Sequence, residues 1–591
     1  MKTKRIFLRL FAMVLATASL AFVWSCIERP MKVADPQPDI ISDFSAIQAS
    51  TRDVDILFMI DTSRSMEEEQ ITLLNNFPAL MRVLKDISGG LPNVHIGVIS
   101  PDIGTYTYNI NGCEGVGDDG KLLKGDGSCS NPVGQNFIVD VEPAGCTIAK
   151  VDDSNTCTSH TCGQTNCEQS AFTIEGVAKE PAGLQFVEDE FGCPRCRNYT
   201  GEDLEDVFTC MADIGIGGCG FEQPLEAIYK ALTPGKNPGF IRDDAYLAMF
   251  LITDEDDCSA KEPGSIFDDS DISITGNLGP LTSFRCTEFG IVCDQTWQRV
   301  ITGGVMNYTN CVSRSSTDAR NMLNPISKYT GFLSTIKSSE MIIAGAIAGP
   351  YNQGNLSVGV DSYQYPELQF VCYPAGSTES GAVPGIRLYE FVKTFIQSED
   401  DLAWAYTSVC NPDYSQALEG LGNKIKALVE VQCITTPLKG CPDPAAANGF
   451  DPITDLSTAE AEICEASCDV RDISTSNNEM VITNINPCPT DYAGGHPEKR
   501  DPSLTVEQCW HVMYNEKCAD PYNDYGPSRG AEIIISRRTN PTPGTSTSIT
   551  CAGTPLVEML CQDGLDNDFD GKTDCEDDDC NNPDNTICSK K

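Results

Sequence analysis

The sequence predicts an α/β fold with a doubly wound, mostly parallel sheet and disulfide-rich insertions. Three observations lead to this fold class. First, four apolar runs each end in a polar turn, as buried parallel strands do; they span residues 54–60, 93–100, 245–254 and 341–348. Second, segments with apolar residues at helical spacing lie between these runs. Third, the chain has 29 cysteines, which fits many disulfide bonds in an oxidising compartment.

The composition limits the classes of partner. At 591 residues the chain is long enough for more than one domain. It has 85 Asp and Glu against 41 Lys and Arg, which gives a formal net charge of −44. Such a charge opposes binding to nucleic acid and anionic lipid, and it favours divalent cations. We therefore expect no nucleic-acid partner, and contact with a membrane only through a lipid anchor.

The first 26 residues have the pattern of a secretory signal. Lys and Arg precede an apolar run at 10–24, and Cys26 follows it. The stretch Val23–Cys26 resembles a bacterial lipobox, whose cysteine becomes lipid-modified; a plain cleaved signal and an uncleaved anchor are the alternatives. Removing Cys26 from the 29 cysteines leaves 28, an even number that can all pair. The resemblance implies export and a lipid anchor in the outer membrane or at the cell surface, because Ile27 is not the aspartate linked to inner-membrane retention.

The predicted body of the protein, residues 53–432, follows a polar, proline-containing tether at 27–52. Its first strand ends in the turn Asp61-Thr-Ser63-Arg-Ser65, and a helical pattern begins directly after it. Ligands of open α/β sheets bind at the carboxyl ends of the strands. One carboxylate and two hydroxyls on a tight turn at this edge are hard oxygen ligands, which suit Mg²⁺. The alternative is that Asp61 and Ser63 only cap the helix.

Two later stretches complete a pattern of three turns. A glycine-rich turn at 215–220 leads into a helix with Pro224 in its first turn, and Glu222 stands just before that helix. Further on, an apolar strand ends in Thr-Asp254-Glu-Asp-Asp-Cys258. In this order the three turns resemble the metal-ion-dependent adhesion site of a von Willebrand factor A (vWA) domain. The sequences of these turns are similar to those of a group of large exported bacterial vWA lipoproteins.

The resemblance implies a metal site that holds Mg²⁺, Mn²⁺ or Ca²⁺ and consists of Asp61, Ser63, Ser65, Glu222 and Asp254. Glu222 stands where the family has a threonine. A third carboxylate would strengthen cation binding, but it could also fill the coordination position that an acidic group of a ligand takes. The implied partner is a protein or surface ligand that binds through such an acidic group.

Two insertions are expected to rise on the metal face, because both leave the carboxyl ends of predicted strands. The first, about 103–200, should be a disulfide-stapled subdomain with eight cysteines: 113, 129, 146, 157, 162, 167, 193 and 196. The second, about 259–335, has cysteines at 286, 293 and 311. We predict that Cys219 and Cys258 pair, because each lies beside a metal-site turn. We also predict a bond between Cys372 and Cys410, which flank a predicted helix.

The C-terminal part is expected to hold two further units. Residues 433–552 read as a compact cysteine-rich β module with a small core around Trp510, to which we assign no chemistry. In the tail, 553–591, the pattern D-x-D-x-D-G-x-x-D-x-x-D resembles calcium loops of thrombospondin type 3 and dockerin repeats. It implies Ca²⁺ bound by carboxylates and one backbone carbonyl, of Asp566, Asp568, Asp570, Lys572, Asp574 and Asp577. A solvated acidic tail is the alternative.

The motifs favour a binding protein over an enzyme. The four histidines form no H-E-x-x-H, and the sequence has no G-x-S-x-G elbow or Walker loop. Cys193-Pro-Arg-Cys196 lies in a polar loop, which favours structural bridges over a redox motif. The remaining enzymatic alternative is a hydrolase within a cysteine-rich insertion. We expect a cell-envelope or surface adhesion protein that uses a vWA-bound cation. The alternative is a calcium-stabilised envelope scaffold with a non-adhesive metal site.

Overall fold

A computed structural model describes most of the chain. It covers residues 40–44, then 52–429 apart from 88–89, 145, 152–155, 168–171, 175–176, 180–182, 244, 338, 376–379 and 397–400, and the segments 433–434, 468–476, 479–489, 504–514, 531–538 and 546–553. The predicted lipidation site Cys26 and the predicted calcium loop, 566–577, lie outside these residues. None of the helices in the described part combines the length and apolar character that a bilayer crossing needs.

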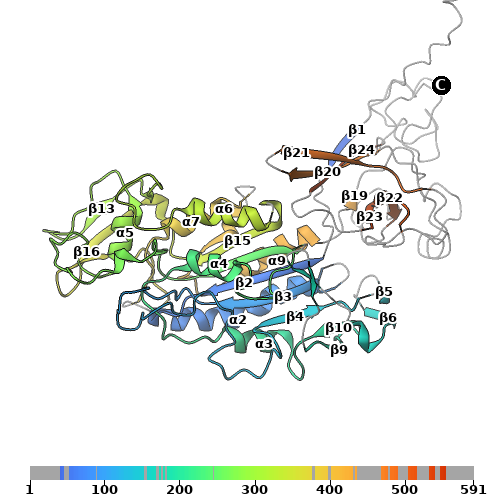
Figure 1. Ribbon diagram of the computed structural model, residues 1–591, viewed down its shortest axis with the longest axis horizontal. Coiled ribbons are helices and arrows are strands. Elements are labelled where there is room, and N and C mark those ends of the chain that lie inside the picture. The colour runs from blue at the N-terminus through green and yellow to red at the C-terminus, as the bar shows by residue number, and fades with distance from the viewer. Residues whose placement is uncertain are drawn as a thin grey trace, which may run out of the picture.

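The body is built on an eight-stranded mixed sheet with the strand order β18-β15-β11-β2-β3-β4-β10-β9 (Figure 1). The strands are β2 (Asp53–Ile60), β3 (Asn93–Ile99), β4 (Phe137–Val141), β9 (Gln185–Glu188), β10 (Pro194–Arg197), β11 (Tyr246–Ile252), β15 (Ile342–Ala348) and β18 (Tyr406–Ser408). The run from β18 to β3 is parallel. The other three strands pair antiparallel. The α/β class is therefore confirmed, with a sheet that is mixed.

Helices cover both faces of this sheet, so the sheet is wound on both sides. The helices α2 (Glu67–Lys85), α3 (Leu204–Ala212) and α9 (Ser415–Val429) pack in one core, and α4 (Pro224–Leu232), α6 (Ile326–Ile336) and α7 (Ile386–Lys393) pack in the other. Alternate residues of β2 supply the two cores: Phe58 faces the first, whereas Leu57 and Met59 face the second. Burial on both faces explains why this strand is a continuous apolar run in the sequence.

The first insertion is joined to the sheet more closely than a separate subdomain would be. Its strands β4, β10 and β9 extend the sheet beyond β3, and it adds the hairpins β5 (Thr147–Val151)–β6 (Thr156–Thr161) and β7 (Phe172–Ile174)–β8 (Val177–Lys179). Three disulfides close within it, Cys146–Cys162, Cys157–Cys193 and Cys167–Cys196. Because Cys193 and Cys196 bond to different partners, the structure supports their prediction as structural bridges.

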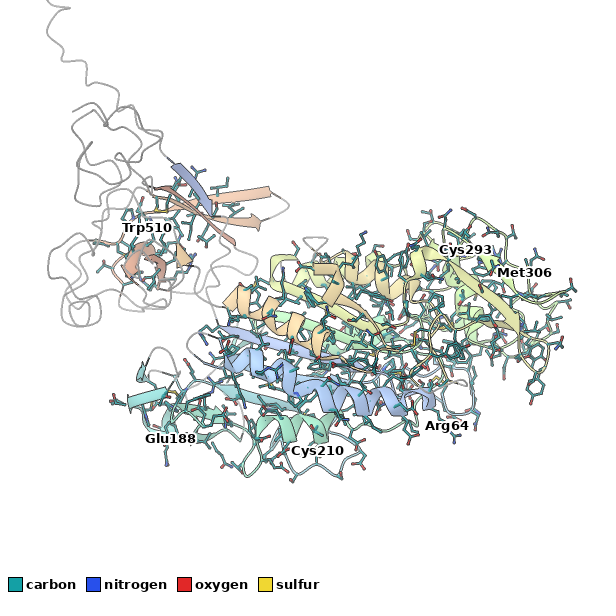
Figure 2. All side chains as sticks on the ribbon, turned by 180° about the vertical axis from the view of Figure 1, so that it is seen from behind. Arg64, Glu188, Cys210, Cys293, Met306 and Trp510 are labelled. Carbon is teal, nitrogen blue, oxygen red and sulfur yellow. A yellow bond between two sulfur atoms is a disulfide. The ribbon has the colours of Figure 1, made fainter. Side chains whose placement is uncertain are left out.

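Parts of the second insertion and of the chain between β15 and α7 form the end of the body opposite the first insertion (Figure 1). They contain α5 (Phe284–Gly290), β12 (Ile291–Val292), β13 (Met306–Tyr308), β14 (Val312–Ser313), β16 (Leu356–Val360) and β17 (Pro366–Leu368). A short helix, α8 (Leu402–Ala405), packs on β15 and α9. Short 3-10 turns lie at Arg64–Met66, Gln164–Asn166, Ser265–Phe267, Ser339–Met341 and Asn352–Gly354. Figure 2 shows Arg64, at the start of α2, at the same end of the body as Cys293 and Met306, and Glu188 at the other end.

The described segments beyond the body agree with a cysteine-rich β module. One sheet has the order β1-β24-β20-β21 and the other the order β19-β23-β22. The strands are β1 (Ile40–Phe44), β19 (Cys433–Ile434), β20 (Cys468–Ser476), β21 (Glu479–Ile485), β22 (Gln508–Tyr514), β23 (Ala531–Arg537) and β24 (Ser546–Gly553). Trp510 is buried in their core, as predicted. Within the predicted tether, 27–52, the strand β1 pairs antiparallel with β24.

A buried ion pair joins the amino ends of two central strands. Asp55, on β2, accepts hydrogen bonds from the backbone N–H and Nε of Arg242, at 2.7 and 2.8 Å. The same guanidinium donates to the carbonyls of Val54 and Asn93, both at 3.0 Å. Removing one partner of such a pair leaves a buried charge without compensation.

We predict that Arg242→Met lowers the free energy of unfolding by about 3 kcal/mol, because Asp55 then stays buried without its cation. Arg82→Met is the matched control. Arg82 pairs with Glu419 at the surface, with side-chain exposures of 68 % and 39 %, so its loss should cost less than about 1 kcal/mol. Urea unfolding with the disulfides intact measures both. Equal losses in the two variants would contradict the prediction.

Candidate metal centre at the switch point of the sheet

The predicted site residues lie at the point where the winding of the sheet reverses. The chain passes from β2 through α2 to β3 on one side, and later returns to place β11 on the other side of β2. Helices that diverge from neighbouring strands leave a crevice beyond the carboxyl ends. Ile60 of β2 and Ile252 of β11 pair in register. Asp61 and Thr253 are therefore the first residues beyond the two strands, and Asp254 follows.

The first turn is held in a tight conformation by its own aspartate. Asp61 is fully buried. Its Oδ1 accepts a hydrogen bond from the Ser63 N–H at 2.7 Å, and its Oδ2 accepts one from the Thr253 hydroxyl at 2.6 Å. The hydroxyls of Ser63 and Ser65 lie 3.1 Å apart. The first and third turns are thus joined directly, with both serine hydroxyls at the junction.

The glycine-rich second turn lies against the other two. The Gly218 N–H donates to the Thr62 carbonyl at 2.9 Å, and the Cys258 N–H donates to the Glu222 carbonyl at 2.8 Å. A Cβ on Gly218 would lie 2.0 Å from Thr62 Oγ1, so only glycine permits this approach. All three predicted turns therefore converge at one edge of the sheet.

Four carboxylates meet at this convergence. Burial raises the pKa of Asp61, although hydrogen bonds from Thr253 and Ser63 oppose the shift. Burial, together with the charges of Glu255 and Asp61, raises the pKa of Glu222 well above its usual value. Burial, followed by the charges of Asp61 and Glu255, does the same for Asp254, against a hydrogen bond from Ser65. Glu255 has its pKa raised to about 7, mainly by burial.

This negative charge lacks the compensation that other buried acids of the protein have. Asp55 and Asp257 each pair with an arginine. Across the described residues, by contrast, no lysine, arginine or histidine forms an ion pair with the four site carboxylates. Oε1 of Glu222 and Oδ1 of Asp254 are also buried without a hydrogen-bond partner. Two carboxylate oxygens are thus left with unused acceptor capacity in a strongly negative crevice.

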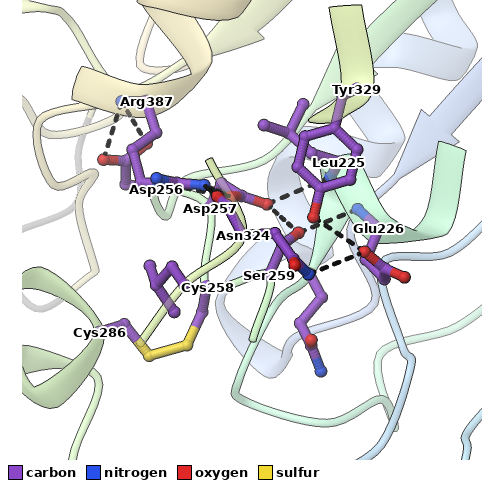
Figure 3. A network of polar contacts seen from close by, with 12 residues as sticks. Leu225, Glu226, Asp256, Asp257, Cys258, Ser259, Cys286, Asn324, Tyr329 and Arg387 are labelled. Carbon is purple, nitrogen blue, oxygen red and sulfur yellow. Dashed lines mark hydrogen bonds and ion pairs between the residues drawn. A yellow bond between two sulfur atoms is a disulfide. The ribbon is translucent and has the colours of Figure 1, made fainter. Parts of the chain in front are cut away.

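A rigid polar network supports the third turn from behind (Figure 3). Asp256 accepts hydrogen bonds from the backbone N–H groups of Ile386, Arg387 and Leu388, at 3.0–3.2 Å, and so caps α7. The next residue, Asp257, pairs with the Arg387 guanidinium at 2.9 Å and accepts from the Ser259 hydroxyl. Consecutive acids therefore have different roles: Asp254 and Glu255 belong to the crevice, whereas Asp256 and Asp257 fix the turn.

The disulfides beside the site correct one sequence prediction. Cys219 does not pair with Cys258; the bonds are Cys113–Cys219 and Cys258–Cys286. All four cysteines lie in one small core. Four cysteines in one place allow three pairings, and the insertions, not the turns, supply the partners. The predicted Cys372–Cys410 bond is confirmed.

The residues present fit a partly hydrated divalent ion. In the part of the chain that the structure describes, no group of three or more His, Cys, Asp or Glu side chains is arranged to hold a metal by itself. Mg²⁺, however, keeps several waters and needs only one or two protein carboxylates. The orphaned oxygens of Glu222 and Asp254, with the Ser63 and Ser65 hydroxyls nearby, offer hard oxygen ligands of this kind.

Sequence reasoning did not include two residues of this crevice. Glu255 follows Asp254 in the same acidic run, but the run gave no sign of which acids face the crevice. Thr253 orients Asp61, and its position directly before Asp254 was a usable signal.

No family model matches the chain, and no curated protein is significantly similar to it.

We predict that without cations the protein loses stability as the pH rises from about 5 to 8. Glu255 has a pKa of about 7 in the folded state and roughly 4.3 when unfolded, so the folded state binds more protons across this range. Its stability then falls as pH rises. Glu255→Gln should reduce this loss by on the order of 2 kcal/mol.

Urea unfolding in EDTA at the two pH values measures this effect. The control is Glu67→Gln, which removes an exposed carboxylate at the start of α2 and should leave the pH dependence unchanged. An identical pH dependence in Glu255→Gln and the parent protein would contradict the prediction.

Proposed function

We propose that residues 53–429 form a vWA-type domain that binds a divalent cation, preferably Mg²⁺, and through it an acidic group on a partner protein or surface. The observation that supports this most is the convergence of three turns on four carboxylates, three of them buried, that form no ion pair with a described lysine, arginine or histidine. A fold that concentrates negative charge in a buried crevice is stabilised by a cation there. The position at the switch point is the usual one for a ligand in an open α/β sheet.

In this proposal Asp61, Ser63, Ser65, Glu222 and Asp254 hold the ion. Asp61 mainly orients the first turn, because both of its oxygens already accept protein hydrogen bonds. The serine hydroxyls and the orphaned oxygen of Asp254 are the available ligands. A bound ion would offer a Lewis-acidic position to an oxygen of the partner. The negative charge of Glu222 determines how much of the ion's positive charge remains to attract that oxygen.

We further propose that the protein is exported and lipid-anchored through Cys26. Ten disulfides join described cysteines. Disulfides persist in oxidising compartments, which supports an extracytoplasmic site. The site residues are hard oxygen ligands tied to structural turns, and we propose adhesion, without catalysis, as their function. Calcium binding by the C-terminal loop stays a prediction.

We predict that the full mature chain binds Mg²⁺ and that Asp61→Ala abolishes this binding, because the first turn loses the side chain that shapes it. At 100 times the dissociation constant the ion should stabilise the parent protein by about 2.7 kcal/mol. Isothermal titration and thermal unfolding measure both effects. Glu222→Thr should keep binding with lower affinity, since one carboxylate is lost.

The control is Asp271→Ala, at an exposed loop position, which should bind like the parent protein. Calcium binding at the C-terminal loop would persist in Asp61→Ala, so this variant distinguishes that loop from the site at Asp61. Absence of Mg²⁺-dependent heat or stabilisation in the parent protein would refute the cation site.

We predict that the protein captures its partner from native envelopes in Mg²⁺, and not in EDTA, because the ion forms the contact. Pull-down followed by mass spectrometry measures this. Asp61→Ala should lose capture and keep its stability in EDTA. Capture that persists in EDTA, together with destabilisation by Asp61→Ala, would instead favour a scaffold whose ion only supports the fold.

A further inference from the structure

A cleft of about 170 Å³ opens beside the candidate metal centre. It lies between the third turn, the start of α5 and strand β17, so three segments far apart in the sequence form its walls. A smaller pocket adjoins it and shares Glu255, Ser283, Leu368 and Val383 with it. Glu222 lines that smaller pocket. The cleft is thus continuous with the acidic crevice, but most of its wall belongs to the second insertion and to β17.

The cleft has apolar walls and carboxylates at its ends. Phe284, Leu368 and Phe370 are among its apolar lining residues. Glu255 lies at the inner end, where the two pockets join, and Asp361 and Glu367 come from the loop and strand at the outer end. Among the described residues, no lysine, arginine or histidine lines the cleft. The cleft is therefore amphipathic, with a charge of about −3 when its acids are ionised. The adjoining pocket is also lined by Arg387, which pairs with Asp257.

Two of these carboxylates, Asp361 and Glu367, come from the β16–β17 hairpin. The N–H groups of Tyr363 and Tyr365 donate to Asp361 Oδ1, both at 2.8 Å, and this turn fixes the carboxylate at the rim. The pKa of Glu367 is raised by partial burial and by the charge of Asp361. Two acids that repel each other stand at the rim of an apolar cleft, and neither forms an ion pair with a described residue.

The second observation comes from the inner end. Glu222 is 1 % exposed, and its Oε1 has no hydrogen-bond partner. This oxygen belongs to a side chain that lines the adjoining pocket. Burying a carboxylate oxygen without a donor is costly. A donor that enters from the cleft would supply hydrogen bonds to this end while its remaining atoms contact the apolar wall.

We propose that this cleft binds one basic side chain of a protein partner, arginine or lysine, with its aliphatic stem against Phe284, Leu368 and Phe370 and its charged end among the carboxylates. The volume is below the roughly 300–1,000 Å³ of pockets that hold whole small molecules, and it suits a single side chain. Long basic side chains bury their stems on apolar surface and keep the charged end for acids. Aromatic walls add cation–π attraction.

This site shares Glu222 and Glu255 with the candidate metal centre, but it does not require an ion there. Asp361 and Glu367 lie on the β16–β17 segment, away from the three turns in sequence. The cleft can therefore be tested in EDTA, where the proposed cation site is inactive. If no basic probe binds the cleft, the result of the Mg²⁺ titration still stands. If no Mg²⁺ binds, the result for the cleft still stands.

The experiment titrates the full mature chain in EDTA with N-acetyl-arginine amide, followed by saturation-transfer NMR. N-acetyl-citrulline amide is the matched probe, with the same shape and no charge. We expect the arginine probe to bind at least tenfold more tightly. Glu367→Gln and Asp361→Asn should each weaken it about tenfold, the expected loss for one charge-assisted hydrogen bond. Asparagine can still accept the two N–H groups that fix the loop, so this variant should fold.

Glu114→Gln, at an exposed position of the first insertion, is the control and should bind like the parent protein. Equal binding of the two probes, or binding unchanged in the Asp361→Asn/Glu367→Gln double variant, would overturn the proposal. One further outcome would also overturn it. If the arginine probe does not bind, and Mg²⁺ binds to the Asp61→Ala chain but no longer binds once Glu367→Gln is added, the cleft is a metal site.

Discussion

The structure depends on keeping four carboxylates together where their mutual repulsion would push them apart. Asp61, Glu222, Asp254 and Glu255 come from three separate turns, and each has its pKa raised by burial. Elsewhere the same fold neutralises a buried acid with an arginine, as at Asp55. The contrast supports the proposed cation site, since an uncompensated buried charge is costly.

The surroundings of the site restrain the turns in the way this repulsion requires. The second turn is bonded covalently to the first insertion through Cys219, and the third turn to the second insertion through Cys258. Asp256 and Asp257 anchor the third turn to α7. These two turns are thus held by different neighbours, and the insertions restrain the site through disulfide bonds. This division of restraints suits a chain that folds where disulfides form.

Sequence alone was sufficient for the parts of the fold that local pattern determines. The strands β2 and β11 are buried on both faces and so appear as continuous apolar runs, which placed Asp61 and Asp254 at the same edge. The pairing of Cys219 and Cys258 failed because four cysteines share one core, and nothing local selects among the pairings. The cleft could not be foreseen either, because Glu367 and Glu255, far apart in the sequence, line one cleft only through the tertiary path of β17.

The two proposed sites are coupled through Glu255, which takes part in the crevice and lines the cleft. A divalent cation beside Asp61 reduces the negative potential that attracts a basic side chain, and the basic side chain reduces the potential that holds the cation. Because such coupling is reciprocal, the two charges alone oppose each other's binding. A partner that brings both an acid and a base removes the conflict, since its acid offsets the ion's charge while its base occupies the cleft. The electrostatics therefore favour a partner surface of mixed charge over a uniformly acidic one.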